Sequence, residues 1–294
     1  MKNVENIKNT TRQIYNFKGQ AKSLSFLYHT SIGRGCLKLL VNPAISKLSG
    51  RFLSTKFSSV MIKNFVKKNN IDLSEFEQRK FSSYNDFFTR KILEGKRSVS
   101  MDKNAFISPC DAKLSAYFID NTSTFKIKDS YYTISDLLNS NPIYKEYENG
   151  ICLIFRLAVD DYHRYCYVDH GTKSKNTFIP GKLHTVQPIA LDNYNIYKTN
   201  SREYTILHTE NFGDIIQIEV GALLVGKIKN HHEEYTFSKG EEKGYFEFGG
   251  STIVLLIKKD MVNIDNEFYL NTQNGYETIV KYGERIGTKN EKFD

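Results

Sequence analysis

The chain has 294 residues, of which 40% are apolar and 13% aromatic, enough to fill a sizeable core and to exclude a disordered protein. Its four cysteines have no CxxC spacing, which favours a reducing compartment. The sequence has no early apolar segment and no apolar run of about 18 residues, so we expect a protein that is neither secreted nor membrane-spanning. The net charge is +8, yet residues 1–70 carry 13 Lys and Arg against one acid, a balance of +12 that leaves −4 for residues 71–294.

The first predicted region, residues 1–95, is basic and helical. Residues 24–68 interleave apolar side chains with Lys and Arg at roughly helical spacing, with breaks expected at Pro43 and Gly50. Such helices can lie on an anionic bilayer with their apolar faces among the headgroups, or form a helical domain whose basic faces are solvated. Nucleic acid is not expected as a partner, because no nucleic-acid signature accompanies the cations. Near the end of the region, Ser83 is expected to cap a helix with Phe87, Phe88 and Ile92 on its inner face.

The second predicted region, residues 96–294, is rich in strands. Short β-branched or aromatic runs are separated by Gly, Asn, Asp and Pro, and the main ones read STFKIKD, GICLIFRLAV, YTILHTE, DIIQIEV, ALLVGKI, YFEFGG and STIVLLI. Only TISDLLNS looks helical in this region. The sequence therefore predicts an α+β protein, with a β-rich catalytic body of packed antiparallel sheets and a basic amphipathic helical N-terminus.

Three chemically useful residues are widely separated along the β-rich region. Asp111 follows a proline turn in SPCDAKL, His163 lies in VDDYHRYCYVDHG, and Ser251 follows two glycines in FGGST. An acid, an imidazole and a serine are the groups needed to activate an oxygen nucleophile. Each residue also has an ordinary structural explanation, so the residues by themselves leave a hydrolase, a lyase and a binding protein open. The NHHEE stretch at 230–234 resembles a metal site, but neighbouring strand residues face opposite sides, which favours a solvated turn.

In combination, these motifs resemble one family, the phosphatidylserine decarboxylases. The resemblance covers about residues 84–257, and its matching segments, in order, are YNDFFTRKILEGKR, ISPCDAKL, FKIKDSYYTISDLL, DDYHRYCYVDHG, PGKLHTV, VGALLVGKI and KGEEKGYFEFGGSTIVLLI. The GGST element preceded by KGEEKGYF is the most specific of them.

The resemblance implies a self-cleaving proenzyme. In the family, the motif serine, here Ser251, attacks the carbonyl of the preceding residue, here Gly250, and elimination then leaves a pyruvoyl group made from the serine. The expected products are chains 1–250 and 251–294, which stay associated. Glycine tolerates backbone geometries that other residues avoid, so Gly250 suits a peptide that must bend toward its own serine. The pyruvoyl carbonyl then accepts electrons when an amino substrate loses CO₂, so neither a metal nor pyridoxal phosphate is expected.

The family also implies residue roles, with one departure. Asp111 and Ser251 match the acid and the serine of the cleavage triad. The histidine motif D-Y-H-R-x-H reads DYHRYC here, so that His163 is its first histidine and Cys166 stands at its second. The second histidine is usually taken as the cleavage base and the first is linked to decarboxylation, so we expect His163 to serve both steps. Cys166 and His170 are less favoured candidates for a part in them, and Arg164 or Arg156 could bind a substrate phosphate.

These implications lead to a peripheral membrane protein on the cytoplasmic face of the cell membrane, which decarboxylates phosphatidylserine to phosphatidylethanolamine in an anionic lipid surface. A homodimer is compatible with the resemblance. Two rival functions remain: a serine hydrolase that uses Ser251, His163 and Asp111 without self-cleavage, and a noncatalytic protein that binds anionic lipid.

Overall fold

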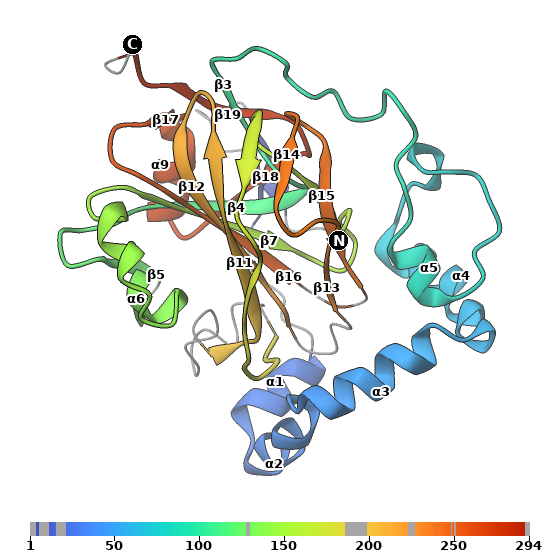
Figure 1. Ribbon diagram of the computed structural model, residues 1–294. Coiled ribbons are helices and arrows are strands. Elements are labelled where there is room, and N and C mark those ends of the chain that lie inside the picture. The colour runs from blue at the N-terminus through green and yellow to red at the C-terminus, as the bar shows by residue number, and fades with distance from the viewer. Residues whose placement is uncertain are drawn as a thin grey trace.

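The structure is a computed structural model that describes residues 4–5, 12–15, 22–127, 130–185, 199–222, 227–247, 249 and 251–291. Antiparallel sheets form the body of the molecule, and helices from the N-terminal region lie beside and beyond them (Figure 1). The α+β prediction, a β-rich body with helices at the N-terminus, is confirmed.

The largest sheet has the strand order β1-β2-β18-β4-β7-β16-β12-β11-β9-β14, with β10 paired to β11. Every residue of β7 and β16 is buried, which explains why Ile151–Phe155 and Ile253–Ile257 read as continuous apolar runs rather than as alternating ones. The strand bounds are β1 Val4–Glu5, β2 Ile14–Tyr15, β18 Glu277–Val280, β4 Ala112–Phe118, β7 Ile151–Leu157, β16 Ser251–Ile257, β12 Gly213–Val220, β11 Arg202–Thr209, β9 Gly171–Lys173, β14 Tyr235–Phe237 and β10 Thr177–Ile179.

Successive residues of β16 enter two different cores. Val254 and Leu256 pack into the core on one face of the large sheet, whereas Ile253, Leu255 and Ile257 pack into the core on the other. The second core is covered by α9 (Asn266–Gln273) and by two small sheets, whose strands are β13 Ile228–Asn230, β15 Glu242–Phe246 and β8 Arg164–Cys166 in one, and β17 Val262–Ile264, β19 Arg285–Lys289 and β3 Ala105–Ile107 in the other.

The first core is covered by the hairpin of β5 and β6, by short helices, and by the start of the N-terminal helical region, which contributes Tyr28, Leu37 and Val41. The TISDLLNS stretch is helical as predicted, with Thr133 capping α6. The elements on this side are β5 Thr124–Ile127, β6 Ser130–Thr133, α6 Ile134–Leu137, η3 Pro142–Tyr147, α1 Lys22–His29 and α2 Ser31–Leu40.

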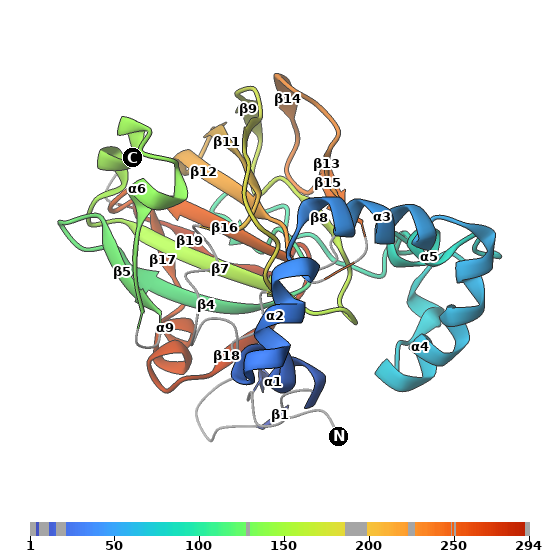
Figure 2. The same cartoon turned by 90° about the horizontal axis from the view of Figure 1, so that it is seen from below.

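Of the remaining N-terminal helices, α3 and α4 lie to one side of the large sheet in both views (Figures 1 and 2), whereas Phe88 of α5 packs against the ring of His163. Pro43 starts a helix, as a proline at the first helical position can, and Asn42 caps it. The break expected at Gly50 is wrong, because the helix continues through Gly50 and ends only at Leu53, which packs against Tyr84 and Phe88. The elements are α3 Pro43–Leu53, η1 Lys56–Val60, α4 Met61–Asn69, η2 Leu73–Glu75 and α5 Tyr84–Phe88.

The helix predicted after Ser83 is present but short. The Ser83 side chain accepts a hydrogen bond from Asp86 N, as expected for a cap, and Phe87 and Phe88 are fully buried. Ile92 does not share this helix face, because α5 ends at Phe88 and Ile92 instead forms an isolated bridge with Phe76.

Most predicted strand runs fall on observed strands, although residues 223–226 of the ALLVGKI run lie outside the described residues. Across the described part of the chain, no helix is long and apolar enough to cross a membrane.

Candidate active site

Ser251 is the first residue of β16, in the interior of the large sheet. It is paired with Leu157 of β7 and is fully buried. Because strand side chains alternate, Ser251 shares the face of Ile253 and Leu255, on the side covered by the small β13-β15-β8 sheet. The sheet thus places a hydroxyl group in an apolar interior, where it requires a hydrogen-bond partner.

That partner is His163, which lies between β7 and β8. Its Nδ1 is 3.2 Å from Ser251 Oγ, and its Nε2 is 2.9 Å from the carbonyl oxygen of Ala158. A carbonyl can only accept, so Nε2 carries the hydrogen, and in the neutral ring Nδ1 is left as an acceptor facing the serine hydroxyl. The pair has the arrangement of a nucleophile and its general base.

Burial keeps this imidazole neutral. His163 is 1% exposed, and its ring lies 4.2 Å, centroid to centroid, from the ring of Phe88. Burial lowers the pKa of His163 to about 3, against the opposing effect of its hydrogen bond to Ala158, and the positive charges of Arg90 and Lys113 lower it further. His163 is therefore unprotonated at Nδ1 across the physiological range, and its lone pair is free to accept the hydrogen bond of the Ser251 hydroxyl.

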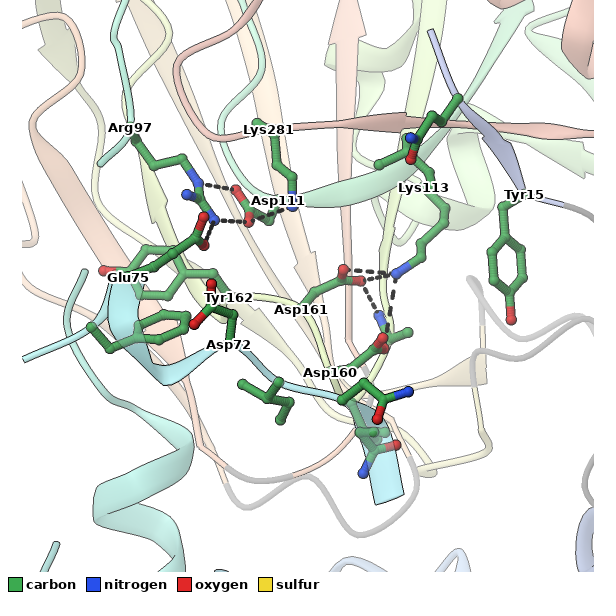
Figure 3. Close-up of a pocket in the computed structure, with 18 of the residues that line it drawn as sticks. Tyr15, Asp72, Glu75, Arg97, Asp111, Lys113, Asp160, Asp161, Tyr162 and Lys281 are labelled. Atoms are coloured by element: carbon green, nitrogen blue, oxygen red, sulfur yellow. Dashed lines mark hydrogen bonds and ion pairs between the residues drawn. The ribbon is translucent and has the colours of Figure 1, made fainter. Parts of the chain in front are cut away.

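The Ala158 carbonyl is itself held in a tight turn. Asp161 N donates to Ala158 O at 3.0 Å, and Ala158 N donates to Asp161 Oδ2 at 2.7 Å. The Asp161 carboxylate also receives Lys113 Nζ of β4 at 2.7 and 2.6 Å (Figure 3). Burial raises the pKa of Asp161, and the Lys113 charge opposes that change.

The backbone of His163 is fixed to the segment that leads into Ser251. Phe246 N, at the end of β15, donates to His163 O at 2.9 Å. Beyond it, Gly249 has φ of +136°, a conformation that other residues rarely adopt, which accounts for one glycine of the GGST motif. Gly250 lies outside the described residues, so the scissile carbonyl has no stated geometry.

Asp111 is placed nearby but not within this pair. Its hydrogen-bond donors among the described residues are Arg97 through Nε and Nη2 at 3.0 and 2.7 Å, Lys281 Nζ at 3.3 Å, and Tyr282 N at 2.9 Å (Figure 3). Burial opposes its ionisation, but the hydrogen bond from Arg97 and the charges of Lys281 and Arg97 outweigh burial and lower the pKa of the carboxyl. Asp111 is therefore a buried carboxylate whose described hydrogen-bond partners do not include His163.

A polar cavity of about 560 Å³ separates the N-terminal helical region from the β-rich body at this point. It is bordered by Asp72 and Glu75 on one side and by Asp111 and Asp161 on the other, with Arg97, Lys113 and Lys281 among its cations (Figure 3).

The residues proposed as alternative bases are engaged elsewhere. Cys166 is fully buried beside Tyr282, with Sγ 4.0 Å from Ser108 O, and burial raises the pKa of its thiol to about 12. A thiol in that state is not a base at neutral pH. His170 accepts a hydrogen bond from Lys239 N at 3.4 Å through Nδ1, in the turn before β9.

Arg164 and Arg156, which the sequence suggested as ligands of a substrate phosphate, form hydrogen bonds with other residues of the protein. Arg164 donates to Thr89 O from Nε and Nη2 and to Glu242 from Nη1. Arg156 binds Glu277, with its shortest distance of 2.6 Å from Nη2 to Oε2. Both therefore tie neighbouring segments together.

Sequence reasoning missed three contributors to the site: the Ala158 carbonyl, Asp161 and Lys113. The second aspartate of the DDYH motif was the available signal, since it lies two residues before His163. Residues 231–234 of the NHHEE stretch connect β13 to β14, as expected, whereas Asn230 is the last residue of β13. Within the described ranges, no group of three or more His, Cys, Asp or Glu side chains is arranged to hold a metal ion.

The fold and the site together define a β-rich protein with a buried serine–histidine pair at the start of a central strand. The family model described as phosphatidylserine decarboxylase matches residues 84–288, and the chain belongs to this family.

Curated relatives agree over nearly the whole chain. The chain is 50% identical to phosphatidylserine decarboxylase proenzyme 2 of Clostridium acetobutylicum over 283 residues, which cover 95% of this chain and 97% of the relative. It is 40% identical to the phosphatidylserine decarboxylase proenzyme of Clostridium botulinum strain Hall, with 97% of this chain and 98% of the relative covered. The corresponding proenzyme of Clostridium tetani is 39% identical, with 97% of each chain covered.

Proposed function

We propose that this chain cuts itself between Gly250 and Ser251 and then decarboxylates phosphatidylserine to phosphatidylethanolamine. The observation that carries the proposal is the 3.2 Å contact between His163 Nδ1 and Ser251 Oγ, made by an imidazole that burial keeps neutral. Membership of the family supplies the substrate class, and the name proenzyme, borne by its relatives, agrees with a cleavage step.

The cleavage begins with transfer of the Ser251 hydroxyl proton to His163 Nδ1. Ser251 Oγ then attacks the carbonyl carbon of Gly250, the C–N bond breaks, and the nitrogen takes a proton, so that the amide becomes an ester. Removal of the Ser251 Cα proton breaks the ester C–O bond, leaving a carboxylate at Gly250 and dehydroalanine at position 251. Water displaces ammonia from the imine tautomer of dehydroalanine, which yields a pyruvoyl group at the new N-terminus.

The pyruvoyl group supplies a carbonyl that accepts the electrons released with CO₂. Its site fits this chemistry, because position 251 is buried next to one imidazole and excludes bulk water. His163 is proposed to serve the decarboxylation step as well, by holding or returning a proton at Nδ1. Asp111 is proposed as a positioning residue, because it accepts a hydrogen bond from the backbone nitrogen of Tyr282, whose side chain lies beside Cys166.

The two products, residues 1–250 and 251–294, are proposed to remain associated. The shorter one would hold β16, which pairs with β7 on one side and β12 on the other. Each large aliphatic side chain buried there stabilises the complex by about 1.5–3 kcal/mol, and β16 buries five, from Ile253 to Ile257. The same product would hold β18 and β19, which pair with strands of the longer chain.

In this proposal residues 1–95 form the membrane-associating region and residues 96–294 the decarboxylase domain. The described helical segment 22–69 carries nine Lys and Arg and no acid. Large apolar side chains are also exposed along it: Phe26, Ile32, Leu39, Ile45, Leu48, Phe52, Phe57, Val60 and Met61. Cations and apolar side chains together suit an anionic lipid surface on the cytoplasmic face of the membrane. Lipid acyl chains require such docking, because exposing them to water costs about 0.8 kcal/mol per CH₂.

Mass analysis of the denatured protein tests the cleavage. We expect two chains separated between Gly250 and Ser251, with the shorter one blocked at its amino end by a carbonyl that borohydride reduces. The Ser251→Ala variant should stay intact and release no CO₂ from carboxyl-labelled phosphatidylserine. A wild-type chain that stays whole yet reacts with a serine-directed phosphonate would instead identify a hydrolase. A whole chain that binds anionic vesicles but releases no CO₂ would identify a lipid-binding protein.

Vesicle sedimentation tests the docking surface. Phe57→Asp and Val60→Asp place charges at the two most exposed apolar positions of η1, with 83% and 77% exposure. Each should weaken binding to phosphatidylserine vesicles, whereas Leu270→Asp on α9 serves as the control and should not. Equal binding by all three variants would contradict docking through this region. The expected homodimer stays a prediction, which light scattering of the purified protein would test.

A further inference from the structure

We propose that Asp161 and Lys113 are positioning residues for self-cleavage: they hold the Ala158 carbonyl at His163 Nε2 and thereby keep the lone pair of Nδ1 directed at Ser251. The inference rests on the proposed function and extends it to two residues outside the serine–histidine pair.

The turn between residues 158 and 161 is closed from both sides. Ala158 O accepts from Asp161 N at 3.0 Å, and Ala158 N donates to Asp161 Oδ2 at 2.7 Å. The same carbonyl oxygen accepts from His163 Nε2 at 2.9 Å. The side chain of Asp161 thus fixes the orientation of the Ala158 residue, whose carbonyl oxygen accepts the hydrogen bond from His163 Nε2.

Lys113 holds that side chain in place. Its Nζ is 2.7 and 2.6 Å from the two carboxylate oxygens, and the Lys113 and Asp161 side chains are only 7% and 12% exposed. Lys113 belongs to β4 and faces Arg156 of β7 in the sheet, so its position is set by the sheet rather than by the turn. The pair therefore connects the 158–161 turn to the rigid part of the fold.

The orientation of this carbonyl matters because a neutral imidazole has two tautomers. With the hydrogen on Nε2, Nδ1 can accept the serine proton. With the hydrogen on Nδ1, the ring would present a donor to Ser251 and could not act as its base. In a serine protease triad, holding the wrong tautomer reduces the rate by about 10⁴-fold.

A matched pair of double variants isolates the hydrogen bond from the ion pair. Lys113→Met with Asp161→Asn removes both charges but keeps an oxygen that can accept from Ala158 N. Lys113→Met with Asp161→Ala removes the same charges and also the acceptor. Asp160→Asn is a further control, because the Asp160 carboxylate lies 4.0 Å from Lys113 Nζ, whereas the hydrogen bond from Ala158 N goes to the Asp161 carboxylate.

Self-cleavage is followed by pulse–chase labelling of the full chain in cell-free translation. Wild type should cleave and Ser251→Ala should not; a wild type that does not cleave overturns the proposed function rather than this inference. We expect the Asn double variant to cleave within about tenfold of wild type, and the Ala double variant to be about a hundredfold slower. Equal rates for the two double variants would overturn the inference, and so would an Asp160→Asn variant as slow as the Ala double variant.

A second measurement does not depend on cleavage. In full chains that carry Ser251→Ala, ¹⁵N spectra of the histidine rings report which nitrogen bears the hydrogen, and a His163→Gln chain assigns the signal. His163 should show hydrogen on Nε2 in the parent and in the Asn double variant, and a mixture of tautomers in the Ala double variant. A folded Ala double variant that retains the pure Nε2–H form would refute the positioning role.

Discussion

The buried imidazole of His163 makes a quantitative prediction about stability. Replacing His163 with Gln, in chains that also carry Ser251→Ala, should reduce the loss of stability that occurs on acidification. His163 has a pKa of about 3 in the folded protein and 6.5 as a free side chain. Its folded pKa is depressed, so stability is present above pH 6.5 and is lost as the pH falls from there toward 3, because only the unfolded chain binds the proton in that window.

The magnitude follows from proton linkage. At about pH 5 the unfolded histidine is almost fully protonated and the folded one is not, which corresponds to a destabilisation of about 2 kcal/mol relative to pH 8. The Gln variant has no imidazole at this position, so its free energy of unfolding should fall by about 2 kcal/mol less over the same interval. Contributions from all other titrating groups are common to both chains and cancel in the difference.

Urea unfolding at the two pH values measures this difference, and the uncut Ser251→Ala background keeps the reaction unimolecular. The Ser251→Ala parent, which retains His163, is the reference chain for this comparison. If the His163→Gln chain loses as much stability between the two pH values as its parent, then His163 is charged or solvated in the folded protein. His163 would then not be the neutral general base of Ser251.

Three further outcomes follow from the packing. Phe88→Ala should expose the His163 ring, which lies 4.2 Å from the Phe88 ring, and so raise the pKa of His163 in an NMR titration. The same change should lower the free energy of unfolding by about 3–5 kcal/mol. An unchanged pKa would show that burial by Phe88 does not keep His163 neutral. Lys243→Met should lower the free energy of unfolding, measured in urea, by about 3–5 kcal/mol, because the fully buried Glu219, 2.8 Å from Lys243 Nζ, loses its counter-charge. Adding Glu219→Gln to that variant should restore part of the lost stability. Gly150→Ala should cost about 1–3 kcal/mol or more, since a Cβ there would lie 2.1 Å from the carbonyl oxygen of Ile257; a melting temperature equal to that of wild type would show that the backbone yields.

Much of the β-rich body could be predicted because its central strands are buried on both faces. The runs Ile151–Phe155 and Ile253–Ile257 are apolar, and each closely follows a glycine, a pattern that indicates strands. The helix that continues through Gly50 was harder to predict. Glycine weakens a helix by only about 1 kcal/mol, which the flanking turns and the contact made by Leu53 outweigh.

The site was predictable only in part, for a physical reason. Ser251 and His163 could be paired because their chemistry is complementary and their motifs are distinctive. The Ala158 carbonyl carries no sequence signature, since every residue has one, and the role of Asp161 depends on a turn that only the fold closes. Asp111 matched a family motif, yet its described hydrogen bonds run to Arg97, Lys281 and Tyr282, an arrangement that residue types alone do not specify.

Ser251 and His163 are 88 residues apart and meet only when β16 is seated between β7 and β12. If the pair performs the cleavage, scission has to wait for assembly of the sheet, and a nascent or misfolded chain stays whole. The fraction of cut polypeptide in a cell extract would then report the fraction of molecules that have completed folding, because the cut is irreversible.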